Sequence, residues 1–227
     1  MSTARDRMLA AVRTGLMSAE LPDASPERPA DLPARAAQTV EAMVTRFTTD
    51  LTALTGEVHH AQAITDLADA IAGIAATYSA SDYLSWHESA LGWPGLIDIL
   101  TSRGLRRVTY DLPFDQAGRD ADVRALAEVG FGLTGSDAAI SEGGGIVLVS
   151  GPGRGRLASL LPPVHVAIVR TSQLYPSLPD LLAARPDLVD RGSNVTIVAG
   201  PSRTADIEMT LTHGVHGPKR VHAILTA

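Results

Sequence analysis

The 227-residue chain contains no cysteine. Disulfide bonds, thiolate-ligated zinc and iron–sulfur clusters on this chain are therefore excluded, because each of them needs cysteine sulfur. The absence is compatible with a reducing compartment, and we expect a cytoplasmic protein that binds no cofactor of its own. Aromatic residues are also scarce, at 4% of the chain, so the core must be built from Ala, Leu, Val and Ile.

Basic residues are too few and too scattered for a polyanionic partner. The chain has 19 Lys and Arg against 25 Asp and Glu, and no basic run occurs. We therefore expect neither nucleic-acid binding nor attraction to an anionic membrane surface. The most apolar stretch, 61–76, carries Asp66 and Asp69, and positions 1–7 lack the apolar region of a signal peptide. Membrane insertion is therefore not expected.

Several catalytic signatures are missing as well. There is no Walker pattern, no dinucleotide fingerprint, no nucleophile elbow and no Ser-His-Asp arrangement. These absences disfavour a nucleoside triphosphatase, a nicotinamide- or flavin-dependent redox enzyme and a serine hydrolase.

The proline distribution divides the chain. Met8, Leu9, Val12 and Leu16 share one helical face, and four prolines then interrupt residues 20–34. We predict an N-terminal helix and proline-rich linker over 1–35, followed by one α/β domain over 36–227. If this N-terminal arm docks on a neighbouring subunit, the protein is a homo-oligomer. The alternative is that the arm is a frayed chain end.

Hydrophobic periodicity in the second part alternates between helix and strand. The continuous apolar runs 146–149 and 164–169 are typical of strands covered on both faces. Alternation of such strands with helices predicts an α/β fold, a mostly parallel sheet flanked by helices. We expect helices near 40–54, 64–74, 95–101 and 120–128, and further strands near 57–61, 83–86, 106–110, 195–199 and 221–225.

A dense polar block follows the apolar run 195–199. In a parallel sheet, ligands bind outside the carboxyl ends of the strands, where this block would begin. We expect Ser202 or Thr204 to cap a helix that begins near Ala205, and its free N–H groups, with the Arg203 guanidinium, to attract an anion. The alternative is an ordinary cap, with Arg203 paired to a nearby acid.

Further along the same block, Asp206 is placed to orient Arg203 or a histidine. His213 and His216 lie in a glycine-broken loop, where an imidazole could hold an acidic ligand. The two histidines could instead bind a metal, but that needs a third ligand, for which Asp206, Glu208, His165 or His222 would be candidates. We assign no metal site.

Two glycine-rich segments precede this block. Residues 132–145 predict strand, turn, short helix, turn and strand, and Glu142 stands just before three glycines as a base, nucleophile or electrostatic partner. The alternative is a tight turn with Glu142 in solvent. In the second segment Arg156 is expected to be held beside an apolar turn and to contact an anionic ligand, and Arg154 to lie in solvent. His87 is a candidate pocket wall.

Four blocks resemble the LUD-domain family, and within it the lactate utilisation protein C group. They are Thr134 to Glu142, Arg156 with Ser159 to His165, Gly200 to Glu208, and Gly214 to Pro218. The likeness covers about 121–225 well, and it adds Thr134 and His165 to the candidate ligand-binding residues. It implies a fold similar to the NagB, ribose-5-phosphate isomerase and CoA-transferase superfamily.

The resemblance also implies a role in oxidising L-lactate to pyruvate beside partner proteins that carry iron–sulfur clusters. The leading hypothesis is a non-redox subunit that binds a small carboxylate through Arg203, His216 and Arg156. Its competitor is a free-standing acyl-transfer or sugar-phosphate isomerase enzyme that uses Glu142, because Ser141 to Gly144 is similar to the Ser-Glu-Asn-Gly element of some CoA transferases. Whether Glu142, Arg203 and His216 share one pocket would separate the two.

Overall fold

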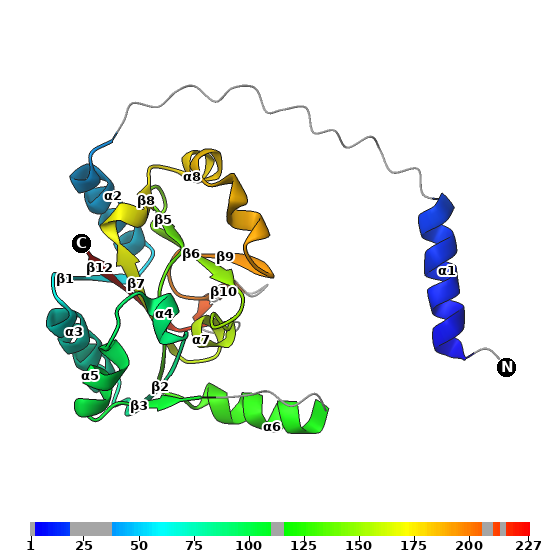
Figure 1. The fold of residues 1–227 in the computed structure, drawn as a ribbon, viewed down its shortest axis with the longest axis horizontal. Coiled ribbons are helices and arrows are strands. Elements are labelled where there is room, and N and C mark those ends of the chain that lie inside the picture. Colours follow the sequence, from blue (N-terminus) through cyan, green and yellow to red (C-terminus); the bar gives the residue numbers. More distant parts are fainter. Residues whose placement is uncertain (1–2, 19–37, 110–115, 206–210, 214–216) are drawn as a thin grey trace. The chain divides into compact units, whose positions relative to one another are not determined.

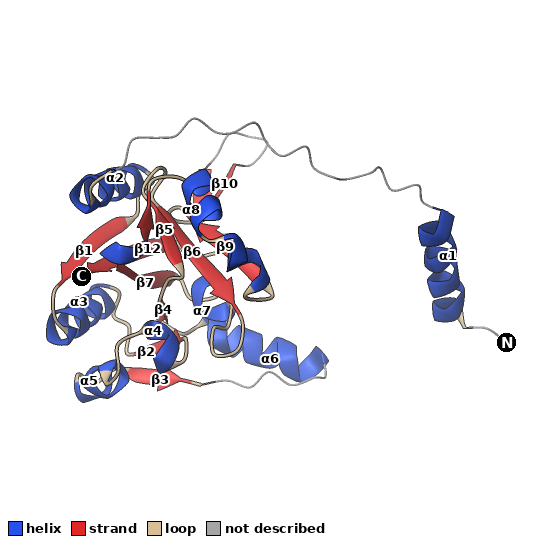
Figure 2. Ribbon diagram, turned by 45° about the horizontal axis from the view of Figure 1, so that its top comes forward, coloured by secondary structure: helices blue, strands red, loops and turns tan. Residues whose placement is uncertain are grey.

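Six strands pair in parallel, in the order β1-β12-β7-β4-β2-β3 (Figures 1 and 2). The computed structural model describes residues 3–18, 38–109, 116–205, 211–213 and 217–227. The strands are β1 (Glu57–Ala61), β2 (Asp82–Ser85), β3 (Arg106–Val108), β4 (Phe131–Thr134), β7 (Val164–Arg170) and β12 (Arg220–Thr226). The predicted α/β class with a mostly parallel sheet flanked by helices is confirmed.

The helices form where the apolar period is 3.6 residues. In α3, Leu67, Ile71 and Ile74 lie on the buried face, and α2 is capped by the Thr39 side chain, which accepts from Ala42 N–H (3.2 Å). Helices α3 and α5 pack on one side of the sheet and α7 on the other (Figure 2). The helices of this unit are α2 (Val40–Ala53), α3 (Ile64–Thr77), α4 (Glu88–Leu91), α5 (Leu96–Ser102), α6 (Gln116–Ala127), α7 (Leu157–Leu160) and α8 (Leu178–Ala184), with 3₁₀ turns η1 (Thr171–Gln173) and η2 (Pro186–Asp190).

A second, four-stranded sheet has the order β8-β5-β6-β9. Its central strand β6 is buried on both faces: Ile146 and Leu148 join the main core, whereas Val147 and Val149 pack in a smaller core beneath α8 and η2. This double burial explains the continuous apolar run. The strands are β5 (Ala138–Ile140), β6 (Gly145–Ser150), β8 (Leu174–Tyr175) and β9 (Asn194–Val198).

Three local expectations are wrong. The segment expected as a short helix within 132–145 is β5, which pairs with both β6 and β8. The run 195–199 forms β9, which pairs antiparallel with β6 instead of joining the parallel sheet. The polar block after it therefore does not follow a strand of that sheet. Apolar run length could not distinguish these sheets, because strands buried on both faces look alike in either.

The third error concerns the helix expected near Ala205. Strand β10 (Arg203–Ala205) stands there and pairs antiparallel with β11 (Leu211–His213), which places Thr204 opposite Thr212. Cross-strand pairing of β-branched residues favours a ribbon over a helix. Only the backbone of these two strands is described.

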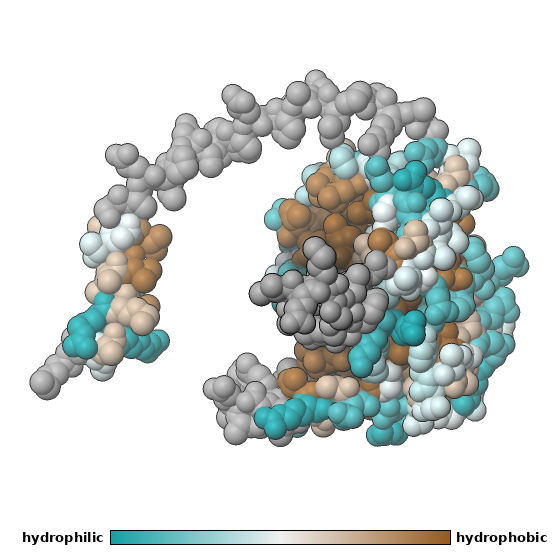
Figure 3. All heavy atoms as spheres, turned by 180° about the vertical axis from the view of Figure 1, so that it is seen from behind, coloured by the Kyte–Doolittle hydropathy of each residue, from teal (hydrophilic) through white to brown (hydrophobic). Residues whose placement is uncertain are grey.

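The chain divides into two units, 1–37 and 38–227. The first contains α1 (Ala4–Ser18), whose large apolar side chains are all exposed. They are Met8, Leu9, Val12, Leu16 and Met17. Figure 3 colours hydrophobic residues brown. Within the described residues, no helix has the length and apolar character needed to cross a membrane.

Candidate functional site

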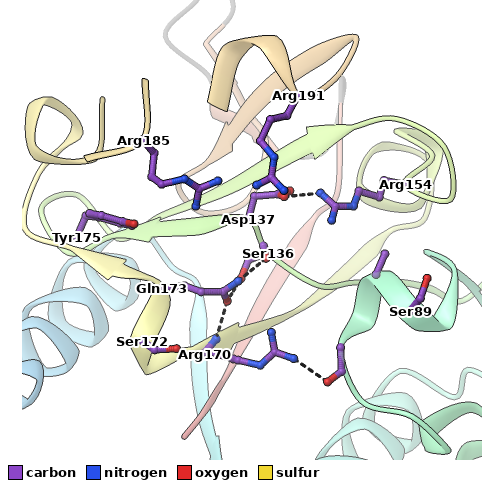
Figure 4. A pocket seen from close by; sticks show the side chains of 12 residues that line it. Ser89, Ser136, Asp137, Arg154, Arg170, Ser172, Gln173, Tyr175, Arg185 and Arg191 are labelled. Carbon is purple, nitrogen blue, oxygen red and sulfur yellow. Dashed lines mark hydrogen bonds and ion pairs between the residues drawn. The ribbon is translucent and has the colours of Figure 1, made fainter. Parts of the chain in front are cut away.

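A pocket of about 290 Å³ lies at the carboxyl ends of β4 and β7, under the second sheet and α8. This is the edge of a parallel sheet at which ligands bind. Four arginines and few apolar side chains surround it (Figure 4). The lining residues are Ser89, Ala90, Gly92, Ser136, Asp137, Arg154, Arg170, Ser172, Gln173, Tyr175, Arg185 and Arg191.

The arginines come from four separate segments. Arg170 ends β7, and Arg154 lies in the turn after β6. Arg185 ends α8, and Arg191 ends η2. Figure 4 shows the Arg154, Arg185 and Arg191 side chains converging from two sides of the pocket. Distant pieces of sequence thus supply one concentration of positive charge.

Arg154 is held by Asp137, whose side chain is 4% exposed and forms an ion pair with Arg154 Nη1. The second Asp137 oxygen accepts from Val149 N–H (2.9 Å), so the carboxylate is fixed on both sides. The Arg154 guanidinium also lies 5.7 Å from the centroid of the Trp86 ring, within cation–π range. Arg154 is therefore pre-positioned at the pocket rim.

Arg185 and Arg191 share one carboxylate. Their Nε atoms lie 3.1 and 3.7 Å from the two oxygens of Asp187. Hydrogen bonds with Asp187 and with the Tyr175 hydroxyl raise the pKa of Arg185 above its ordinary value. Among the described residues around the pocket, four guanidinium groups thus meet two carboxylates, Asp137 and Asp187, and positive charge is in excess.

The floor of the pocket is a hydrogen-bonded network. Gln173 Nε2 donates to Ser136 O (2.7 Å), and Gln173 Oε1 accepts from Arg170 N–H (3.0 Å). Arg170 Nη2 donates to Gly92 O (2.6 Å). A Cβ at Gly92 would lie only 2.0 Å from Arg170 Nη2, so this contact requires glycine. The network orients polar groups without adding a group that titrates near neutral pH.

Two more cavities adjoin this one along the sheet edge. One, of about 330 Å³, is lined by residues of α4 and its flanks, and the other, of about 310 Å³, by the glycine-rich turn after β6. His87 lines both, in agreement with its expected place as a pocket wall. Ser89 and Gly92 are shared between the first of these and the arginine pocket.

The family model for the LUD domain matches residues 44–226. The chain belongs to the LUD domain family. Among curated relatives, Lactate utilization protein C of Geobacillus sp. is 27% identical, over 70% of this chain and 68% of its own length. The protein of the same name from Halalkalibacterium halodurans is 33% identical, over 68% of this chain and 66% of its own. Matches to further relatives span about half of their length.

A solved structure shows the same fold. A DUF162 family protein from Deinococcus radiodurans superposes with a TM-score of 0.62, at 22% identity, and covers 84% of this chain and all of its own. At this identity the likeness concerns the fold alone.

Two of the family-matched residues, Thr134 and His165, lie inside the LUD domain and do not line the described pockets. Thr134 Oγ1 and His165 Nε2 are 2.9 Å apart, and both side chains are fully buried. Burial lowers the pKa of His165 to about 4, so its imidazole is neutral at neutral pH. The pair joins β4 to β7 within the sheet.

The predictions for Arg154 and Arg156, the two arginines after β6, are both wrong. Arg156 is exposed, whereas Arg154 is the one held in place, by Asp137. The apolar turn beside Arg156 supplies no counter-charge, and the buried carboxylate of Asp137 lies across from Arg154. The pairing joins residues 17 apart in different elements, so local sequence does not reveal it.

Only part of the polar block that follows residue 199 lies within the described residues. Ser202 is half-buried, and its N–H donates to Pro218 O (2.9 Å). Arg203 and Thr204 belong to β10, of which only the backbone is described. Asp206 and His216 lie outside the described residues. A shared pocket of Glu142, Arg203 and His216 therefore stays a prediction.

Glu142 is exposed in the turn between β5 and β6, at the end of β5 opposite to the arginine pocket. Its neighbourhood is α2: Gly143 N–H donates to Asp50 Oδ2 (2.8 Å), and a Cβ at Gly144 would lie 2.5 Å from Leu51 N. Gly143 and Gly144 both have positive φ. Gly144 thus permits the close approach of α2, which is a packing role.

Sequence reasoning missed Arg170, Arg185 and Arg191. One signal existed for Arg170, because a charged residue that ends a buried parallel strand lies at the ligand-binding edge. Arg185 and Arg191 flank a short 3₁₀ turn, and no pattern distinguishes them from surface arginines.

Proposed function

We propose that this chain is a non-redox subunit of an L-lactate-oxidising (lactate utilisation) system and that it binds a small carboxylate in the arginine pocket. The proposed role is substrate binding, gating or assembly, next to partner proteins that carry the iron–sulfur clusters. The absence of cysteine supports a division of labour in which thiolate-ligated clusters belong to the partners.

Family membership supports the lactate part of the proposal. The relatives from Geobacillus and Halalkalibacterium carry the name Lactate utilization protein C, and they align with about two thirds of this chain. We extend that role to this chain because the matched region includes the whole described α/β unit from Val44 onward. We also propose that the chain acts in the cytoplasm.

The observation that carries the ligand proposal is the excess of guanidinium groups around one recess. A planar guanidinium matches a carboxylate through two parallel hydrogen bonds, and it stays protonated at every physiological pH. Arg185 and Arg191 share one partner carboxylate, so together they keep guanidinium hydrogens for a second anion. Ser172, Tyr175 and Ser89 supply hydroxyls for the remaining polar atoms of a hydroxy or keto acid.

Calorimetric titration of the full chain with L-lactate and with pyruvate tests the proposal. We expect saturable binding of at least one of the two, and a loss of about 10-fold or more in affinity in the double variant Arg185→Gln/Arg191→Gln, since charge-assisted hydrogen bonds are worth about 1.5–3 kcal/mol each. Arg46→Gln is the matched control, because Arg46 is 57% exposed on α2 and outside the pocket lining.

Two results would contradict this proposal. The first is the absence of heat with either acid, both alone and after mixing with the iron–sulfur partner proteins. The second is equal affinity in the double variant and in Arg46→Gln.

A further inference from the structure

Three potential metal ligands meet toward the amino ends of β1 and β12, opposite to the arginine pocket. They are Glu57, His59 and His222. Glu57 pairs in register with His222, and His59 lies two residues further along β1, so all three side chains share one face of the sheet. Their ligand atoms all lie within 4.8 Å of one another.

The spacing of these atoms fits a tetrahedral ion. His59 Nε2 lies 3.1 Å from His222 Nδ1, and His222 Nδ1 lies 3.7 Å from Glu57 Oε2. Tetrahedral bonds of about 2.0–2.1 Å place neighbouring ligand atoms about 3.3 Å apart, between the two observed separations. Two imidazoles and one carboxylate are also the donor set of known three-ligand zinc sites.

Tyr78 contacts the ring nitrogen of His222 that faces away from the cluster. Tyr78 Oη, at the end of α3, lies 3.0 Å from His222 Nε2. When that nitrogen donates its proton to the tyrosine oxygen, the lone pair of Nδ1 points toward His59 and Glu57. A hydrogen bond on the far ring nitrogen is the usual way in which a metal-ligating histidine is oriented.

The exposure of the cluster differs from one member to the next. The His222 side chain is 3% exposed, whereas that of Glu57 is 54% exposed. An ion can therefore enter past Glu57, and its fourth coordination position would face solvent. The negative charge of Glu57 favours a cation beside His222 and opposes the effect of Arg220, the cation two residues before His222.

We propose that Glu57, His59 and His222 bind one divalent transition-metal ion of the zinc class. The ion ties the edge strand β1 to β12 and leaves one position for water. This site is separate from the arginine pocket, and the proposal does not depend on lactate binding.

The test uses the full chain without a histidine tag, titrated with Zn²⁺ and then subjected to elemental analysis after dialysis. We expect one zinc per chain and a loss of at least 10-fold in affinity in Glu57→Gln and in His59→Gln. Both positions are more exposed than His222, so these variants are expected to fold. His60→Gln is the matched control, because His60 is the neighbouring, exposed histidine on the opposite face of β1.

A second readout uses melting temperature. Zinc should raise it in the wild type and in His60→Gln, and should not do so in His59→Gln. Absence of zinc uptake by the wild type would overturn the proposal. So would binding that survives both cluster variants, or binding that is lost when His213 and His216 are replaced while the cluster is intact.

Discussion

At the carboxyl ends of β4 and β7, four arginines and one carboxylate, Asp137, line a recess, and a second carboxylate, Asp187, pairs with two of those arginines. Toward the amino ends of β7 and β12 lie two buried histidines, His165 and His222, hydrogen-bonded to Thr134 and Tyr78. Burial lowers the pKa of both imidazoles to about 4, which keeps them neutral. One end of the sheet is therefore permanently cationic, and the other offers neutral nitrogen lone pairs.

The two ends of the sheet thus differ in how their charge responds to pH. Guanidinium groups keep their charge at any working pH, so an anion site built from them does not switch with acidity. A buried imidazole changes its charge with pH. It stays neutral until the pH is well below its ordinary pKa, because protonation places a charge in an apolar environment. The predictions below separate the two ends by perturbing each in turn.

Acidification should give the largest effect, and only at the histidine end. The pKa of His165 is about 4 in the folded chain and about 6.5 when unfolded, so the unfolded state binds more protons in that window. Stability is then lost as pH falls from about 6.5 to 4, by about 3 kcal/mol for this residue. Urea unfolding at a series of pH values, with EDTA present, measures the loss.

The control for acidification is His60→Gln, which should keep the wild-type profile. His165→Gln should remove the share of the loss that comes from His165 and leave the share that comes from His222. The arginine end keeps its charge across the same range. An unfolding free energy that is constant between pH 6.5 and 4 would show that the buried imidazole does not control the profile.

Removing Asp137 should have the next largest effect, at the arginine end. Asp137→Ala deprives Arg154 of its partner and Val149 N–H of its acceptor. Breaking a buried pair costs about 3–5 kcal/mol, and the 30% exposure of Arg154 reduces our expectation to about 2 kcal/mol. Asp187→Ala, at a 55% exposed carboxylate that pairs with two arginines of the pocket, should cost less than about 1 kcal/mol. Equal losses in urea unfolding would contradict this ranking.

The smallest effect should come from the Thr134 hydroxyl, which is hydrogen-bonded to Nε2 of His165. Thr134→Val keeps the side-chain shape and removes the 2.9 Å hydrogen bond to Nε2, at a cost of about 1 kcal/mol or somewhat more. Thr101→Val, on the exposed surface of α5, is the reference and should cost close to nothing. If the two valine variants unfold at the same urea concentration, the buried hydrogen bond adds no stability.

Local patterns predicted most elements of the fold because each pattern requires only neighbours in sequence. The predicted segments 40–54, 57–61, 64–74 and 221–225 match α2, β1, α3 and β12. The segment around Ala138 was misassigned as helix because its three short apolar residues suit either state. Its pairing with β6 and β8 decides for the strand.

The candidate site was harder to predict than the fold. Arg154 was expected in solvent, and the residue that holds it, Asp137, is in another element. Arg185 and Arg191 converge only because α8 and η2 fold back over β5 and β6. Likewise His59 and His222 are 163 positions apart and meet only because β1 pairs with β12.

Residue types and their spacing were enough to predict an α/β domain with a parallel sheet, without disulfides or thiolate-held metals. They could do so because residue type and spacing fix which faces are apolar. Which arginines surround one pocket, and which histidines lie side by side, depends on the tertiary structure. Strand order sets those distances, and strand order follows from the packing of the whole core, not from any local stretch of sequence.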